Sequence, residues 1–478
     1  MGWPCYVRQP DKRRLGPRCY IFVANPFPPS RSTARQRLAA ILKGMRPPAS
    51  DPRTDRRDLL LAAGIFVLID VVAAATQPLI DVAGGRGWDG ATYYQVAQQL
   101  AAGIRPIADA PFVYRLGTPA LAALLTPNDL FSGFVIVNAA ANALTAMLVF
   151  LWLRRFIASS WTRLALFVSF VAMWHGPIRF FHFYPVSAEH LTYAANVIGL
   201  LVAYAFRDRI SWRLVAGLGI LTAIGVAVRE TALLAAAALP FLRNPLRRDL
   251  RAPRAGLLLF VPVVAGVAAL LIVHSIASQT NSYGFLSAIT FRFAEKNPLV
   301  YVLGWWNAYG PILIVPIVAW RRSLQFLRSH QMLAAFLGAC AALGWVGGQD
   351  TERYVFWAAP IVYLLVGDAL PSVFAGLSRW VVVAIAGMQA FAERVGVAVP
   401  QPSTIDPELL SRDRSFDHLM LLTPIGGNVD YFDLWSFWMP RMAKTILLAE
   451  YAALLIIVAA LVYWRSARAR ARRAAAPI

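Results

Sequence analysis

The stretch FSGFVIVNAAANALTAMLVFLWL, residues 131–153, decides the fold class. It contains no charged residue, and Arg154 and Arg155 follow it directly. A transmembrane helix needs about 20 predominantly apolar residues, so this stretch is long enough to cross a bilayer. The whole chain of 478 residues is 58% hydrophobic and 15% charged, whereas a soluble domain carries about 25% charged residues. The sequence therefore predicts a helical membrane protein.

Comparable apolar runs recur along the chain and predict an all-α, polytopic bundle of about twelve transmembrane helices. The runs lie at 59–76, 131–153, 161–175, 189–206, 213–228, 231–242, 256–273, 299–319, 331–346, 354–370, 379–392 and 444–464. The division of 213–242 at Arg229-Glu230 is a choice. If this stretch is instead one long helix, every later loop changes sides of the membrane.

The distribution of charge predicts the orientation. The net charge of +21 would suggest a nucleic-acid partner in a soluble protein, but Lys and Arg collect on the cytoplasmic side of membrane proteins. With the division at Arg229-Glu230, most of the 46 Lys and Arg residues fall on one face, which also holds both termini. We therefore expect that face to be cytoplasmic. The three cysteines are too few for a disulfide framework.

This pattern divides the chain into four segments. Residues 1–58 are basic and lack periodicity, which favours a disordered cytoplasmic tail attracted to anionic lipid; a gene start placed too far upstream, with true initiation near Met45, explains them equally well. Residues 59–392 form the transmembrane core and 393–443 an extracytoplasmic loop. Residues 444–478 hold the last span and a basic cytoplasmic tail.

The first outer loop carries the most informative residues. Asp89 lies in the glycine-rich stretch GGRGWDG, residues 84–90, ahead of an amphipathic stretch that predicts a re-entrant or juxtamembrane helix. Asp89 is expected either to cap that helix or to present a carboxylate to a cavity. The stretch PFVYRLGTPALAALL, residues 111–125, completes the region and contains Arg115.

This arrangement resembles the bacterial GT-C superfamily of integral-membrane glycosyltransferases. The resemblance implies transfer of a sugar from a polyprenyl-phosphate donor to a glycan, lipid or protein acceptor, on the extracytoplasmic side of the bacterial inner membrane. In that family an acidic residue of the first outer loop acts as general base, a role that matches Asp89, with Asp81 in reserve. The chain departs from the family in having no Asp-x-Asp pair in this loop.

The chemistry implied by the resemblance also needs cations, because the departing lipid phosphate is anionic. Arginine binds phosphate through a two-pronged fork and stays charged at membrane depth. Arg115, Arg229 and Arg353 lie at predicted outer ends of spans and are the candidates. Glu230 follows Arg229, but adjacent helical residues point about 100° apart, so the two need other partners.

Further candidates for substrate contacts are Tyr93, His182, Glu189 and His190. For the histidines around the second outer loop, satisfied interfacial side chains are the preferred interpretation. Asp350 and Glu352 are expected to fix Arg353 rather than to hold a divalent cation, since two carboxylates make a thin metal site. No other metal or cofactor is expected, because no His-Glu-x-x-His or nucleotide-binding glycine motif is present.

Three other functions compete with the transferase. A secondary transporter or flippase for a lipid-linked or anionic substrate would show internal repeats and helices broken at the midplane. An O-antigen polymerase or ligase would place its main loop late in the chain, where 393–443 lies. A membrane scaffold without chemistry does not explain Arg229 and Glu230 in apolar surroundings.

Overall fold

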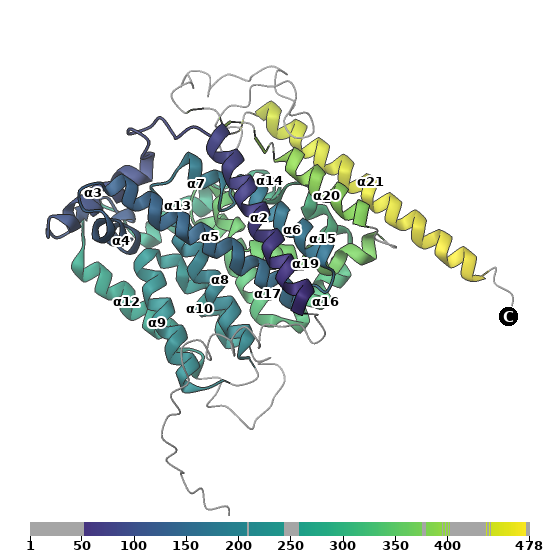
Figure 1. Cartoon of the computed structure of the whole chain (residues 1–478), viewed down its shortest axis with the longest axis horizontal. Coiled ribbons are helices and arrows are strands. Elements are labelled where there is room, and N and C mark those ends of the chain that lie inside the picture. The colour runs from purple at the N-terminus through teal and green to yellow at the C-terminus, as the bar shows by residue number, and fades with distance from the viewer. Residues whose placement is uncertain are drawn as a thin grey trace, which may run out of the picture. The chain divides into compact units, whose positions relative to one another are not determined.

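The computed structural model describes residues 52–207, 210–242, 258–374, 379–393, 395–396, 398–399, 401, 436, 439 and 441–474. Within these residues the regular structure is helical apart from one short strand pair (Figure 1). The all-α fold class is therefore confirmed. The residues predicted as the basic tail before Pro52, and most of the predicted extracytoplasmic loop, lie outside the described ranges.

The α-helices in chain order are α2 (Pro52–Thr76), α3 (Trp88–Ala101), α4 (Gly117–Leu125), α5 (Leu130–Phe156), α6 (Ser160–Ala172), α7 (Arg179–Phe183), α8 (Glu189–Ala205), α9 (Trp212–Val228), α10 (Leu233–Ala238), α12 (Val261–Ile276), α13 (Phe285–Glu295), α14 (Pro298–Tyr309), α15 (Ile314–Val318), α16 (Trp320–Ser329), α17 (Gln331–Val346), α18 (Thr351–Phe356), α19 (Ala359–Val373), α20 (Arg379–Ala392) and α21 (Arg441–Ala474). The 3₁₀ turns are η1 (Phe112–Tyr114), η2 (Glu230–Ala232), η3 (Leu239–Leu242) and η4 (Gly310–Leu313). The strands are β1 (Ile107–Ala108) and β2 (Ser278–Gln279).

Several helices are long and apolar enough to cross a membrane. In the described part of the chain there are four, and a fifth if α16 and α17, which meet at 114°, form one broken span. The four are Arg56–Thr76, Leu130–Phe156, Pro298–Val318 and Lys444–Arg465. The length and composition of these helices indicate a membrane protein. Each of the twelve predicted runs coincides with helical structure, while the number of crossings stays a prediction.

The first helix begins earlier than the sequence suggests. Helix α2 starts at Pro52, inside the segment expected to be a tail. Asp58 is fully buried and accepts hydrogen bonds from Arg163 at 2.5 Å and Ser160 at 2.6 Å. These bonds tie the beginning of α2 to the beginning of α6, and a buried carboxylate is stable only when it is paired in this way.

The helix formed by 212–242 breaks where the sequence predicts. Helix α9 ends at Val228, Arg229 is extended with φ −162° and ψ 136°, and the chain returns through η2 into α10. A side chain at Gly225 would meet the Cβ of Ala232 at 2.8 Å, so the two helices touch next to the turn. Farther from the turn, Leu218 and Leu239 line one gap. The two halves thus form an antiparallel hairpin, and the predicted division at Arg229-Glu230 is confirmed.

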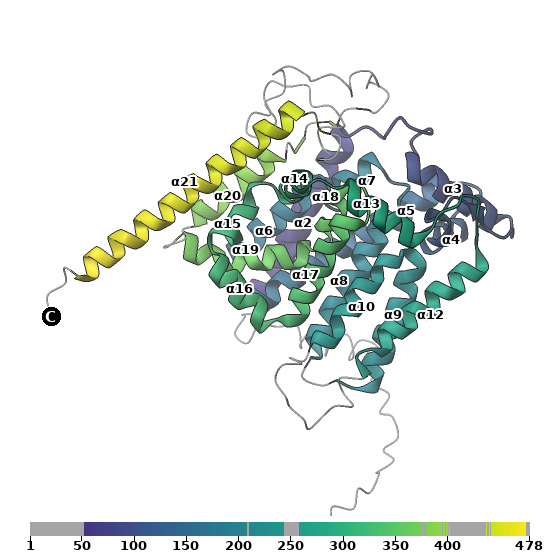
Figure 2. The ribbon, with the colours of Figure 1, turned by 180° about the vertical axis from the view of Figure 1, so that it is seen from behind.

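The predicted first outer loop is fastened to the segment after α12. Strands β1 and β2 pair in parallel, with Ile107 opposite Ser278. Ala110 and Asn281 exchange two hydrogen bonds, of 3.0 and 2.9 Å. The sequence gives no sign of this link because two-residue strands leave no periodicity. Helices α3 and α4, which the link holds, lie beside one end of α5, α9 and α12 in both views (Figures 1 and 2).

Candidate functional site

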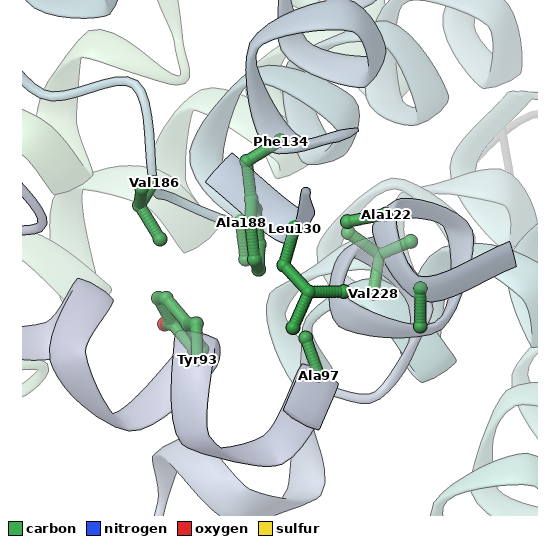
Figure 3. Close-up of a cluster of buried hydrophobic side chains, with 9 residues drawn as sticks. Tyr93, Ala97, Ala122, Leu130, Phe134, Val186, Ala188 and Val228 are labelled. Atoms are coloured by element: carbon green, nitrogen blue, oxygen red, sulfur yellow. The ribbon is translucent and has the colours of Figure 1, made fainter. Parts of the chain in front are cut away.

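A cluster of buried apolar side chains clamps together the three segments that carry the predicted acids and bases. Tyr93 stands four residues after Asp89, Ala188 directly precedes Glu189, and Val228 directly precedes Arg229. Their side chains meet in one cluster with Phe134 of α5 (Figure 3). Packing in this cluster therefore fixes the relative positions of charged residues that are far apart in the sequence.

Asp89 lies in the first turn of α3. Its predicted role as N-cap is wrong, because the cap position belongs to Gly87, and no side-chain capping bond forms there. The helix N-terminus carries a partial positive charge that favours an anion in the first turn. The Asp89 side chain is 25% exposed and lies 3.7 Å from the guanidinium of Arg353. Its carboxylate makes no hydrogen bond to another of the described residues.

Arg353 of α18 is the centre of the charged cluster. It donates to Glu189 at 2.5 Å and to Asp350 at 2.9 Å, in addition to its approach to Asp89. Its side chain is 15% exposed, and that of Glu189 is 3% exposed. Burial alone would lower the pKa of Arg353, but the carboxylates of Asp350 and Asp89 raise it above its ordinary value. Arg353 therefore stays charged at any physiological pH.

Arg229 is the second cation of this cluster. It forms an ion pair with Glu189, which is thereby shared between two arginines. The Arg229 guanidinium is 2% exposed and lies 4.9 Å from the ring of Trp357 and 5.6 Å from that of Tyr354. Aromatic faces stabilise a cation that has lost its water. The extended backbone at Arg229 turns this side chain into the cluster instead of onto the face of α9.

Arg115 and Glu230 form a separate, bidentate pair. Arg115 donates to the two carboxylate oxygens of Glu230 at 2.6 and 3.0 Å, and its remaining terminal nitrogen donates to the Tyr93 hydroxyl at 2.8 Å. Arg115 is 4% exposed and Glu230 is 32% exposed. The expectation that Arg229 and Glu230 need different partners is confirmed, since one binds Glu189 and the other binds Arg115.

The predicted candidates therefore fall into two adjoining groups. Asp89, Glu189, Arg229 and Arg353 form one charged cluster, and Arg115, Glu230 and Tyr93 form the other. Tyr93 joins the two groups, because its chain segment also carries Asp89. Arg353 is 15% exposed, against 4% for Arg115, and it faces the partly exposed Asp89 and Asp350, so it is better placed to meet a ligand.

The two histidines lie around this cluster but do not join it directly. His182 bonds to Asp70 of α2 at 2.9 Å. His190 is 1% exposed and bonds to Asn142 of α5 at 2.9 Å. The ring of Phe180 lies between His190 and Arg353, at 6.0 Å from the one and 5.7 Å from the other.

Asp350 and Glu352 point to different places. Asp350 pairs with Arg353, as the sequence interpretation preferred. Glu352 is fully buried and accepts a hydrogen bond from the backbone N–H of Ser436 at 2.6 Å. Burial raises the pKa of Glu352 to about 7. Among the described residues no group of three His, Cys, Asp or Glu side chains is arranged to hold a metal ion.

Two residues that support the site were missed by sequence reasoning. Lys296 donates to the carbonyl of Gly348 at 2.5 Å and to the hydroxyl of Thr351 at 2.7 Å. These bonds hold the loop that carries Asp350 and the start of α18, which carries Arg353. Tyr184 accepts a hydrogen bond from the backbone N–H of Gly90 at 2.6 Å. The paired glycines around Asp89 were the available signal for Tyr184, since they indicate a neighbour that approaches the backbone closely.

Comparisons with protein-family models, with curated proteins and with solved structures gave no match for this chain. The chemistry of the site therefore rests on its geometry. A partly exposed carboxylate stands beside a permanently charged guanidinium, and both are held by buried packing. Such a pair can accept a proton from a hydroxyl group and stabilise a nearby anionic leaving group.

Proposed function

We propose that this chain is a membrane glycosyltransferase that moves a sugar from a polyprenyl-phosphate donor to an acceptor hydroxyl on the extracytoplasmic side. Asp89 acts as general base and takes the hydroxyl proton. The acceptor oxygen then bonds to the anomeric carbon, and the bond from that carbon to the phosphate oxygen breaks with its electron pair. Arg353 stabilises the charge on the departing lipid phosphate.

One observation carries the proposal, namely the difference between Asp89 and the other three acids of the site. Glu189 is buried between two arginines, Glu230 is held bidentate by Arg115, and Asp350 bonds to Arg353 at 2.9 Å. Asp89 combines exposure with the longest contact, 3.7 Å. A general base needs a carboxylate that a substrate can reach and that is not consumed by a protein cation.

The resemblance to GT-C enzymes supports the same assignment, because Asp89 occupies the first predicted outer loop. The pair of Asp89 and Arg353 is also suited to discriminate between reaction stages. Before transfer the two attract each other as an ion pair. After Asp89 takes a proton, Arg353 loses part of that attraction and is released toward the new phosphate charge. Interactions that strengthen along the reaction are the ones that accelerate it.

A transporter or flippase of a lipid-linked or anionic substrate is the second candidate, and broken helices favour it. The chain breaks at Arg229 and again at η4, where Gly310 has φ +62°. Transporters bind their substrates near the bilayer midplane. Here the charges lie at helix ends instead: Glu189 is the first residue of α8, and Arg229 follows the last residue of α9. That position supports chemistry at the membrane surface.

The test is sugar transfer by the purified protein from a set of polyprenyl-phosphate donors, with wild type beside Asp89→Asn. Asparagine keeps the shape of the side chain and removes the base, so we expect kcat to fall by about 10²- to 10⁴-fold while donor binding is retained. Asp81→Asn is the control and is expected to keep activity. Unimpaired turnover by Asp89→Asn would refute the assignment, and loss of activity in Asp81→Asn alone would move the base to Asp81.

A further inference from the structure

We propose that Tyr184 is a positioning residue that sets the place and orientation of Asp89. The inference rests on the proposed function for its kinetic consequences, but its structural content is independent of it. Tyr184 follows α7, whereas Asp89 lies in α3, so the two belong to different outer loops. The proposed role of Asp89 as general base does not by itself assign any role to Tyr184.

The hydroxyl of Tyr184 reaches the backbone of the residue after Asp89. It accepts a hydrogen bond from the N–H of Gly90 at 2.6 Å. This N–H belongs to the first turn of α3, where backbone donors have no partner within the helix. Tyr184 is 5% exposed, so its bond to Gly90 is shielded from water. The tyrosine therefore performs the capping that no side chain at Gly87 can perform.

The ring of Tyr184 packs against the backbone of Gly87 and Gly90, the two glycines that flank Trp88 and Asp89. A Cβ at Gly87 would lie 2.3 Å from a ring carbon of Tyr184, and Gly87 has φ +72°, a conformation that favours glycine. A Cβ at Gly90 would lie 2.9 Å from the same ring and 2.5 Å from the carbonyl oxygen of Val186. The motif Gly-Trp-Asp-Gly is thus shaped around one tyrosine side chain.

Tyr184 is itself held firmly. Its ring packs with Phe180, whose ring lies 5.6 Å away, and Phe180 also faces the Arg353 guanidinium. Phe183, the preceding residue, accepts a backbone hydrogen bond from Ile80 at 2.9 Å. The packed pair of Tyr184 and Phe180 therefore contacts both the segment that carries Asp89 and the side chain of Arg353. Through this pair, Tyr184 fixes the position of Asp89 relative to Arg353.

The experiment compares wild type with Tyr184→Phe, which keeps the ring and removes the hydrogen bond. Tyr94→Phe is the matched control: it removes a hydroxyl from α3 itself, where Tyr94 contacts Arg86 through its ring. We expect Tyr184→Phe to lower kcat about tenfold or more with KM changed less than about twofold, because a misplaced base slows the chemical step without weakening substrate binding. Tyr94→Phe should behave as wild type in both constants.

Amide hydrogen exchange on the same full-length proteins gives a readout without substrate. The amides of residues 88–97 should exchange faster in Tyr184→Phe than in wild type or Tyr94→Phe, because the start of α3 has lost its bond. Gly90→Ala should exchange faster as well. Equal exchange in Tyr184→Phe and wild type would overturn the inference, even if activity fell. If wild type transferred no sugar, the proposed function would fail while the exchange data still decided the role of Tyr184.

Discussion

Glu352 is a carboxyl group outside the predicted spans whose pKa is raised into the physiological range. It is fully buried next to the arginine that the proposed reaction uses, and burial raises its pKa from 4.5 to about 7. The neutral acid keeps its acceptor oxygen for Ser436 and avoids the cost of an isolated buried charge. Lys296 and Asp350 lie close enough to act on it electrostatically.

The sign of the resulting pH dependence is set by this shift. A carboxyl whose pKa is higher in the folded state binds its proton more tightly there, so its contribution is complete below about 4.5 and is lost as the pH rises through 7. The loss corresponds to an order of 3 kcal/mol for a shift of this size. We expect Glu352→Gln, which is neutral at every pH, to remove this part of the dependence.

The measurement is thermal unfolding of the purified protein between pH 5 and pH 8.5. Wild type should lose more stability over this range than Glu352→Gln, and the two curves should diverge as the pH rises to about 7 and run parallel above it. Glu295→Gln is a suitable control, since Glu295 is partly exposed and pairs with Arg292 on the surface of α13. Curves for wild type and Glu352→Gln that are parallel over the whole range from pH 5 to pH 8.5 would show that Glu352 is ionised at neutral pH.

At the residue scale, sequence reasoning succeeded where the free-energy cost of a side chain depends only on its immediate sequence surroundings. Arg229 and Glu230 are expensive in an apolar run whatever surrounds them, so a break and new partners could be predicted there. The identity of the partners could not, because Arg229 and Glu189 are 40 positions apart and Arg115 and Glu230 are 115 apart. Nothing in one apolar run records which other run will face it.

At the scale of elements, the hydropathy of single helices predicted α5 and the apolar part of α21 well, since Leu130–Phe156 and Lys444–Arg465 are both long and apolar. The continuation of α21 to Ala474, through residues predicted as a basic tail, was not predicted. Amphipathic or short elements were harder. Helix α16 lies between two predicted spans and was treated as part of a loop around Arg321 and Arg322, although its ten residues alternate apolar and polar side chains with a helical period. The bridge between β1 and β2 was missed since each strand contributes two residues only.

The contact between α4 and the end of α9 gives a prediction at this scale. A Cβ at Gly117 would lie 2.9 Å from the backbone nitrogen of Val228 and 2.6 Å from a methyl group of the same residue. Backbone atoms next to a break cannot move without shifting Arg229. We therefore expect Gly117→Ala to lower the unfolding temperature and to reduce sugar transfer, although it changes no charged residue.

Gly217 of α9 provides the matched control, because a Cβ there meets nothing within 4 Å. Gly217→Ala should be neutral or stabilising by up to about 1 kcal/mol, since alanine favours a helix more than glycine does. The comparison uses thermal unfolding and transfer activity on both variants. Equal behaviour of the two would mean that α4 is free to move away from Val228.

For the whole molecule, the charge pattern predicts that α3 and α16 lie on opposite sides of the membrane. Gln98 of α3 and Gln325 of α16 are exposed and chemically identical, so cysteine can replace each with the same local change. In a background where Cys5 and Cys19 are serine, and with Cys340 buried, a membrane-impermeant thiol reagent added to intact cells should label Gln98→Cys and not Gln325→Cys. The opposite pattern would reverse the orientation, and labelling of both or neither would place the two helices on one side.

The hairpin of α9 and α10 has a consequence for how such a chain can change over evolutionary time. Because it leaves and returns on the same side, its two ends impose no inversion on the helices after it. A duplication, loss or exchange of the whole unit would leave the orientation of every later segment across the membrane unchanged. The gain or loss of a single helix would instead invert the orientation of all later segments. Arg229 lies at the tip of this hairpin, so the residues that line the site there can change without altering the order or direction of the other helices.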